Sequence, residues 1–459
     1  MKLKMIAAGA LMSCSLIATT ALAKVTAEQA AALGGDTLTT MGAEVKGNAD
    51  GSIPAWTGSM SGVPAGLSYS GPGDIYPDPY ATEKPLFTIT KANMATYADK
   101  LSEGEKALLT KYDTFKMNVY PSHRDGRSSE KVEARTKWNA TKTELINGED
   151  GLTNFTGGAP FPIPATGAEA IWNARIIHPH PTIVGAFDDM AVYLDGKQQK
   201  RRQKMVSEFP FSYAENEVGT VDDAIGVNAA FVHVTIEEPA RQKGQMTIVH
   251  EALDQVKNER KAWVYIPGAR RVRRAPTVGY DTPDGPGGLV TVDDSLGFNG
   301  ALDRFTWTLA GKKEVYIPYH AYKFDDPKVK YDTLLQKGHA NPDYMRYELH
   351  RVWIVEADLK DGQRHVYKKR RFYIDEDSWQ IVLLESFDGR GELWRVGILN
   401  TLYDYSLQGY VARAQMFHDL QSGAYITTRM VNQTAPVNYM AKPKGEKYYS
   451  PSNLRKMGR

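Results

Sequence analysis

The residues with the most distinctive chemistry are four arginines that follow an aromatic segment. Residues 263–267 read Trp-Val-Tyr-Ile-Pro, and the arginines come shortly after them: Arg270, Arg271, Arg273 and Arg274. Guanidinium groups grip phosphate and carboxylate groups bidentately. The run therefore predicts a site for an anionic group, such as a lipid head group. The competing interpretation is internal ion pairing, with acids of the same chain as partners: Asp281, Asp284, Asp293 and Asp294.

Other charged or metal-binding residue types give weaker signals. His178-Pro179-His180 places two imidazoles in an extended segment, but no cysteine is available and no acid follows before Asp188. Three or four ligands are the norm for a protein metal site, so no metal site is assigned. Two basic runs, residues 200–204 and 368–371, are expected to be solvated faces.

The familiar catalytic signatures are missing. The sequence has no G-x-S-x-G, H-E-x-x-H, G-x-x-x-x-G-K-[ST] or G-x-G-x-x-G motif. Carboxylate pairs such as Asp293-Asp294 and Asp325-Asp326 occur in any chain of this size. We therefore assign no catalytic residue and no cofactor, and we expect a protein that is not an enzyme.

The N-terminus indicates export. Lys2 and Lys4 precede an apolar stretch over residues 6–18, and Ala21-Leu22-Ala23 forms a cleavage site, which together predict a signal peptide over residues 1–23. The single cysteine, Cys14, lies in this leader. A lipoprotein anchored at Cys14 is the alternative. We expect a periplasmic protein without disulfides.

Charge balance argues against a nucleic-acid partner. The chain has 56 basic and 54 acidic residues, and two of the basic residues, Lys2 and Lys4, belong to the leader. The mature chain is then formally neutral, whereas nucleic-acid-binding proteins are commonly basic. No later stretch is long and apolar enough to span a membrane.

The mature sequence divides into an irregular N-terminal part and a larger folded part. Residues 24–90 begin with a short helix and continue as a Pro- and Gly-rich extended arm, because proline removes backbone donors and resists helices. Residues 91–459 are predicted to form one domain. Helical spacing occurs in three early stretches, at residues 92–112, 129–146 and 167–177.

From residue 182 onward the pattern changes to strands. Alternating segments joined by short turns predict an antiparallel meander, with strands at residues 231–236, 245–250, 261–267, 351–359, 365–374, 380–387, 393–399, 412–420 and 425–431. Residues 276–327 are predicted to be a long loop that covers a site or docks a partner.

Three separated segments resemble one known family. They are residues 38–58, 265–283 and 372–394, and the last of them contains Tyr373-Ile374-Asp375-Glu376-Asp377-Ser378-Trp379. On these segments the chain resembles the DUF1329 family of exported proteobacterial proteins. The resemblance implies a fold similar to the LolA/LolB-type lipoprotein carriers. That fold is an α+β, mainly β structure in which a curved antiparallel sheet forms an incomplete barrel covered by helices.

The resemblance also implies a role in envelope transport, because such proteins are often encoded beside RND-type exporters and an outer-membrane DUF1302 protein. Our leading hypothesis is a periplasmic carrier of a lipid or other hydrophobic molecule. The arginine run would meet its head group, and five aromatic residues would line the cavity: Trp263, Tyr265, Trp353, Tyr373 and Trp394. The alternative is an adaptor that bridges the exporter and the outer-membrane protein without a ligand. An envelope hydrolase has the least support.

Overall fold

The structure is a computed structural model, and it describes residues 25–177, 180–275 and 279–458. The predicted leader, with Cys14, lies outside these residues, and so do His178 and Pro179. The expectations about the leader therefore stay predictions. In the part of the chain that is described, no helix combines the length and the apolar composition needed to cross a bilayer.

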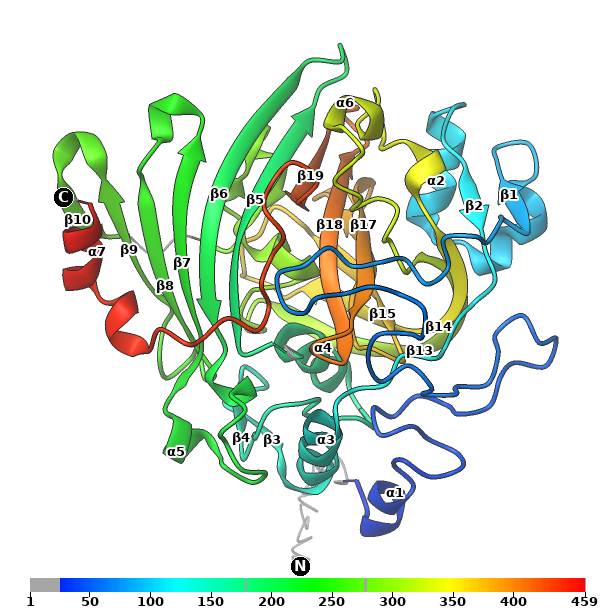
Figure 1. Ribbon diagram of the computed structural model, residues 1–459, viewed down its shortest axis with the longest axis horizontal. Helices are drawn as coiled ribbons and strands as arrows, with labels where there is room; N and C mark the ends of the chain where they lie inside the picture. The colour runs from blue at the N-terminus through cyan, green and yellow to red at the C-terminus, as the bar shows by residue number, and fades with distance from the viewer. Residues whose placement is uncertain (1–24, 178–179, 276–278, 459) are drawn as a thin grey trace, which may run out of the picture.

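A large curved sheet dominates the molecule (Figure 1). Its strands follow the order β1-β2-β14-β15-β16-β17-β18-β19-β5-β6-β7-β8-β9-β10, and β13 pairs with β14. All pairs are antiparallel except β2 with β14. The two ends of this order, β1 and β10, do not pair with each other, so the sheet is not closed into a barrel. The predicted mainly β fold with a curved antiparallel sheet is confirmed.

The bounds of the strands in this sheet are β1 Phe87–Ile89, β2 Met117–Val119, β5 Thr182–Val192, β6 Gln198–Glu208, β7 Asn228–Glu238, β8 Met246–Ala252, β9 Lys261–Ile266, β10 Arg271–Arg274, β13 Phe305–Pro318, β14 Tyr347–Leu359, β15 Lys369–Asp375, β16 Ile381–Phe387, β17 Leu393–Asp404, β18 Gly409–Asp419 and β19 Tyr425–Met430. Two small hairpins stand apart, β3 Glu144–Ile146 with β4 Gly151–Thr153 and β11 Pro283–Asp284 with β12 Val290–Thr291.

The helices are short. The α-helices are α1 Ala27–Ala31, α2 Glu103–Lys111, α3 Glu130–Lys142, α4 Gly167–Ile176, α5 Asp222–Ile225, α6 Tyr331–Leu334 and α7 Pro451–Met457. Ser102 caps α2 by accepting a hydrogen bond from the Glu105 N–H, so the helical stretch predicted over residues 92–112 is divided just before α2. The second helical prediction, over residues 129–146, was too long, because α3 ends at Lys142 and residues 144–146 form β3.

The prediction of a loop over residues 276–327 was wrong in its second half. Phe305–Pro318 is the long strand β13, which pairs with β14 over its whole length. The alternation of Phe305, Trp307 and Leu309 is interrupted at Gly311, where the pairing register shifts. Because a bulge moves the following side chains to the other face, the strand does not show one continuous alternation in the sequence.

The two basic runs are only partly solvated, because several of their arginines form ion pairs within the fold. Arg370 of β15 is fully buried, where it pairs with Asp293 and Asp294 at 3.0 and 2.7 Å. Arg201 and Arg202 of β6 pair with carboxylates of the adjacent strand β5, Asp189 and Asp188 respectively. The sequence prediction missed these pairs because the carboxylates lie on other elements.

Two hydrophobic cores fill the part of the sheet from β13 to β19, which we call the filled half. Phe372 and Ile374 of β15 belong to the core that contains Trp172 of α4. Tyr373, which lies between them in sequence, belongs to the other core, with Leu108 of α2. Successive residues of a strand point to opposite faces, so both faces of the filled half are covered.

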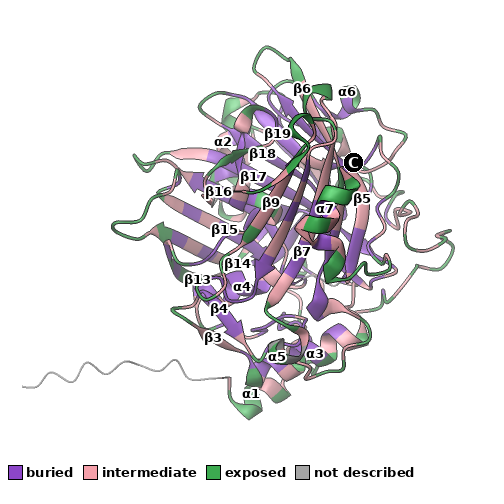
Figure 2. Ribbon diagram, turned by 90° about the vertical axis from the view of Figure 1, so that its left-hand side faces the viewer, coloured by how far each residue is buried: buried purple, intermediate pink, exposed green. Residues whose placement is uncertain are grey.

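Strands β6 to β10 form a second region, which we call the wing. In Figure 1 the wing extends away from β13–β15, and α7 lies against its outer strands. A small core joins Leu454 of α7 to Met246, Ile248 and Tyr265. Figure 2 shows that α7 is largely exposed, whereas β13–β18 carry many buried residues.

The extended arm contains no helix or long strand between residues 47 and 85. Its aromatic rings hold it against the sheet: Tyr76 packs on Tyr405, and Tyr80 stacks on His123 with ring centres 4.1 Å apart. The arm is therefore part of the packed structure.

Candidate functional site

The arginine run forms the last strand of the sheet. Arg271, Arg273 and Arg274 lie on β10, and Arg270 precedes them in the left-handed conformation with φ of 48°. All four are exposed, and within the described residues no ion pair involves any of them. The alternative of internal pairing was therefore wrong. The four candidate acids have other basic partners: Asp281 pairs with Arg304, Asp284 with Arg201, and both Asp293 and Asp294 with Arg370.

Strand pairing separates the arginines between two faces of the wing. Arg273 lies opposite Val264 on β9, and Arg271 lies opposite Ile266. Arg274 lies opposite Trp263. Because directly opposed residues share a face, Arg271 and Arg273 lie on the face that points away from α7.

That face of the wing is apolar along β7 to β9, and among the described residues only Met205 of β6 and Ala230 at the start of β7 join it to a core. Val234 lies opposite Thr247, which in turn lies opposite Val264, and Val232 lies opposite Val249. These residues are partly exposed and belong to none of the cores. We call the set the apolar wing face: Val232, Val234, Ile236, Val249, Val264 and Ile266. Ile266, beside the arginines, is 40% exposed.

Two predicted aromatic ligands lie on the opposite face of the wing. Tyr265 is buried under α7, and its hydroxyl donates a hydrogen bond to the Gly458 carbonyl. Trp263 packs beside it, with its ring edge-on to His250. Both rings contribute to holding α7 on the sheet.

The other three predicted aromatic residues are in the filled half, far along the sheet from β9. Trp353 stacks on Trp379, Tyr373 donates a hydrogen bond to Glu385, and Trp394 donates one to Asp419. The structure therefore does not bring the five aromatic residues together around one cavity. Their role in ligand binding stays a prediction.

None of the nine predicted ligand residues lines either of two pockets in the described part of the molecule. One, of about 500 Å³, is an open hollow at the turns after β5 and β18, lined by Tyr193, Leu194, Asp195, Lys197, Ser422 and Ala424. The other is small, about 30 Å³, and Asp377, Ser378, Trp56 and Tyr410 are among its lining residues.

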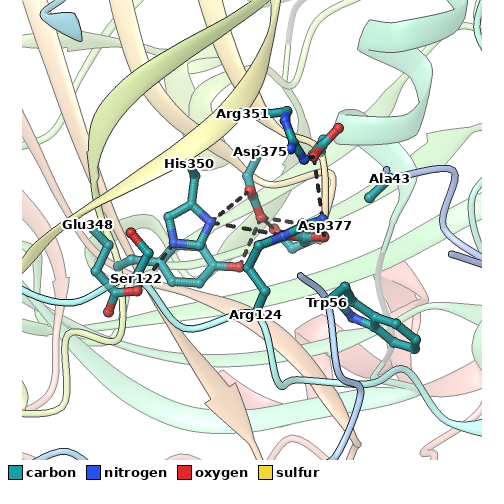
Figure 3. Close-up of polar contacts among 12 residues, drawn as sticks. Ala43, Trp56, Ser122, Arg124, Glu348, His350, Arg351, Asp375 and Asp377 are labelled. Carbon is teal, nitrogen blue, oxygen red and sulfur yellow. Dashed lines mark hydrogen bonds and ion pairs between the residues drawn. The ribbon is translucent and has the colours of Figure 1, made fainter. Parts of the chain in front are cut away.

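A cluster of buried ionisable groups lies beside the small pocket (Figure 3). His350 is on β14, Asp375 ends β15, and Asp377 lies in the turn before β16. The Nδ1 atom of His350 is 3.9 Å from an oxygen of Asp375 and 3.9 Å from an oxygen of Asp377. These three side chains have the types and the spacing of metal ligands.

Other side chains hold the cluster in place. Arg124 donates two hydrogen bonds to Asp377, at 2.7 and 2.8 Å. Tyr319 and Ser378 donate to Oδ2 of Asp375, and Glu348 lies 3.2 Å from Nε2 of His350. The Glu348 carboxylate also binds Arg346 and His320. The neighbouring Glu376 pairs with Arg351.

Burial and neighbouring charges shift the pKa values of the three groups in different directions. Burial, and then the Asp377 charge, raise the pKa of Asp375 to about 6. Burial also opposes ionisation of Asp377, but the Arg124 guanidinium outweighs it and holds the pKa of Asp377 well below its usual value. Burial disfavours the charged form of His350, yet Asp377 and Glu348 raise its pKa to about 9.

No sequence motif identifies this cluster, although Asp375 and Asp377 lie within one of the segments that resemble the family. His350 is 25 residues away from Asp375 in the sequence, so no local motif joins them. The available signal was strand register. Val352 pairs with Asp375 and the Glu376 N–H bonds to the Arg351 carbonyl, which brings residue 350 beside residues 375–377.

The comparisons with known proteins agree with the family resemblance. The family described as "Protein of unknown function (DUF1329)" matches residues 88–455. An uncharacterized protein of Pseudomonas aeruginosa is 42% identical over 452 residues, which cover 97% of this chain and 96% of that protein.

Solved structures show more distant similarity. A DUF1329 family protein from Desulfovibrio piger is 12% identical, with a TM-score of 0.41 over 60% of this chain and 92% of that chain. A LolA superfamily protein from Nitrosomonas europaea is 14% identical, with a TM-score of 0.38 over 62% of this chain and 98% of that chain. From the family match over residues 88–455 and the relative that aligns along almost the whole sequence, we conclude that this chain belongs to the DUF1329 family.

Proposed function

We propose that this protein is a periplasmic carrier that binds an amphiphilic molecule, with an apolar chain and an anionic head group, on the apolar wing face. The observation that carries the proposal is the combination of uncovered aliphatic side chains with Arg271 and Arg273 on one face of the sheet.

The apolar part of the ligand would lie across strands β7, β8 and β9. Neighbouring strands are about 4.8 Å apart, so these strands and β10 offer a surface about 14 Å wide for an acyl chain. Each methylene group removed from water contributes about 0.8 kcal/mol to binding. In the filled half the corresponding faces are packed with the chain's own side chains, which leaves the wing as the region for a ligand of this kind.

The head group would meet the two arginines at the edge of this face. Arg271 and Arg273 are exposed and have no carboxylate partner in the described residues. Unpaired guanidinium groups are available for a phosphate or carboxylate group, which they bind with charge-assisted hydrogen bonds.

Native mass spectrometry of mature protein purified gently from the periplasm tests the proposal. We expect a bound lipid or hydrophobic metabolite at a near-stoichiometric amount, which solvent extraction would identify. An apo mass, together with no binding of added lysophospholipids, would contradict the carrier function and favour the ligand-free adaptor.

Charge variants test the head-group contact. Lysophosphatidylglycerol, which is anionic, should bind more tightly than zwitterionic lysophosphatidylcholine. The double variant Arg271→Gln/Arg273→Gln should lose this preference. The matched control is Arg270→Gln/Arg274→Gln, which removes the same charge from the same run but leaves both arginines of the apolar wing face. Equal losses in both double variants would show that only net charge matters.

A polar substitution tests the apolar contact. Val234→Asn/Val264→Asn should weaken binding of both lysophospholipids, because it places amides in the middle of the apolar wing face. Val256→Asn is the control, since Val256 is 57% exposed outside this face. Unchanged binding by the double variant would place the ligand elsewhere.

A further inference from the structure

We propose that His350, Asp375 and Asp377 bind one divalent metal ion, with Zn²⁺ as the preferred cation. The site lies in the filled half, and it is independent of the ligand proposed for the wing. Neither the family nor the sequence motifs assign a metal to this protein.

The first argument is that buried polar atoms of the cluster face one another without forming hydrogen bonds. The Nδ1 atom of His350 and the Oδ1 atom of Asp375 are both buried and have no hydrogen-bond partner. The side chain of His350 is 0% exposed, and so is that of Asp375. Buried polar atoms without partners are uncommon because desolvation is costly. A cation placed among these atoms would satisfy them together.

The second argument is that each ligand has its other side held by the protein. Glu348 lies at Nε2 of His350 and accepts its hydrogen bond, so an ion bound at Nδ1 would displace only the proton on that nitrogen. Tyr319 and Ser378 occupy Oδ2 of Asp375 and leave Oδ1 free. Arg124 fixes Asp377. Metal-binding histidines and carboxylates are commonly supported by such partners.

The third argument is distance. Nδ1 of His350 is 3.9 Å from each carboxylate, and all the ligand atoms lie within 4.8 Å of one another. Ligands 2.0–2.2 Å from a tetrahedral zinc ion are about 3.3–3.6 Å apart. A small inward rotation of the side chains brings these atoms to that spacing. A direct hydrogen bond from a protonated His350 would need a separation of about 3 Å.

The small pocket supplies the remaining requirements. Asp377 and Ser378 line it, and its volume of about 30 Å³ is enough for about two water molecules. A water in this pocket would complete the coordination from the side of Asp377. One imidazole with two carboxylates suits a borderline cation such as Zn²⁺ better than Ca²⁺, which takes six or more oxygen ligands.

The test begins with the unaltered mature protein, purified without a histidine tag and freed of metal by a chelator that is then removed. Titration with Zn²⁺ should show one bound ion per chain by elemental analysis and a rise in thermal unfolding temperature. Ca²⁺ at the same concentration should produce neither. A correctly folded protein that takes up no zinc would overturn the proposal.

Substitutions locate the ion. His350→Gln and Asp375→Asn should reduce bound zinc from about one ion per chain to background. His320→Gln is the matched control, because His320 is equally buried and contacts the same Glu348 at 2.9 Å but is not part of the cluster. Tyr319→Phe removes a supporting hydroxyl and should weaken zinc binding by about 10-fold.

Anomalous scattering at the zinc edge, recorded from crystals of the unaltered protein, decides the location even if a variant fails to fold. Density between His350, Asp375 and Asp377 is the expected result. Zinc found only at surface histidines, or zinc retained fully by His350→Gln and Asp375→Asn, would overturn the assignment.

Discussion

The filled half and the wing use the same antiparallel sheet in opposite ways. In the filled half, both faces are covered, and charged groups such as Arg370 are buried with their partners. In the wing, one face is covered by α7 and the other carries aliphatic side chains that no core covers. There the arginines are exposed and have no acidic partner among the described residues.

This difference indicates where a ligand could bind without disturbing the fold. A face that is already packed at the density of a protein interior has no room for an acyl chain. An uncovered apolar face with cations at its edge can accept one and gain free energy from the burial. The buried cluster around His350 belongs to the filled half, so its expected ligand is an ion rather than a large molecule.

The largest expected contrast concerns charge. Arg370→Met leaves Asp293 and Asp294 buried without their main partner, which should reduce the free energy of unfolding by about 3–5 kcal/mol. Arg273→Met on the exposed strand β10 should change it by less than about 0.5 kcal/mol. Urea unfolding followed by tryptophan fluorescence measures both. Similar values for the two variants would contradict the division between the halves.

The next contrast concerns two isoleucines on strands. Ile374 is fully buried in the filled half, and Ile374→Ala should cost about 2–5 kcal/mol of unfolding free energy. Ile266, at the edge of the apolar wing face, is 40% exposed, and Ile266→Ala should cost less than about 0.5 kcal/mol. A large cost at Ile266 would mean that the wing face is covered in solution.

Buried acids in the filled half should make its stability depend on pH. Burial raises the pKa of Glu105 on α2 to about 8. Between about pH 4.5 and 8 the unfolded chain has lost this proton and the folded chain keeps it, so the contribution of Glu105 to stability falls as pH rises.

Glu105→Gln should remove this fall. Between about pH 4.5 and 8 the free energy of unfolding of the variant should therefore rise relative to that of the unaltered protein, by up to about 1.4 kcal/mol per pH unit, with no further gain above pH 8. Urea midpoints from pH 5 to 9 measure the effect. Glu103→Gln, at an exposed position of the same helix, is the control and should run parallel to the unaltered protein. If the urea midpoints of Glu105→Gln also followed those of the unaltered protein at every pH, the raised pKa of Glu105 would be refuted.

The smallest expected effect is local to the wing. Leu454→Ala removes the side chain that joins α7 to Tyr265 and Ile248, so backbone amides of β8 and β9 should exchange hydrogen faster. Amides of β15 to β18 should exchange at unchanged rates, because their cores do not include α7. Equal acceleration in both regions would show that the sheet opens as one unit.

The sequence alone determined the nature of the fold and most of its strands. Alternation predicted β15 to β19, and helical spacing over residues 92–112 predicted α2, because local backbone preferences are set by near neighbours. It also singled out the arginine run by composition. Strand β13 was missed, since the bulge at Gly311 breaks the alternation on which that prediction depends.

The tertiary structure alone decided which residues meet. It paired Arg370, whose run had been expected to be solvated, with two aspartates about 75 residues away, and it separated the five aromatic residues that were expected to share a cavity. It brought His350 beside Asp375 and Asp377, and placed Arg271 and Arg273 on the apolar wing face. The physical reason is register: side chains alternate between faces along a strand, so a contact across the sheet depends on long-range pairing that local sequence does not encode.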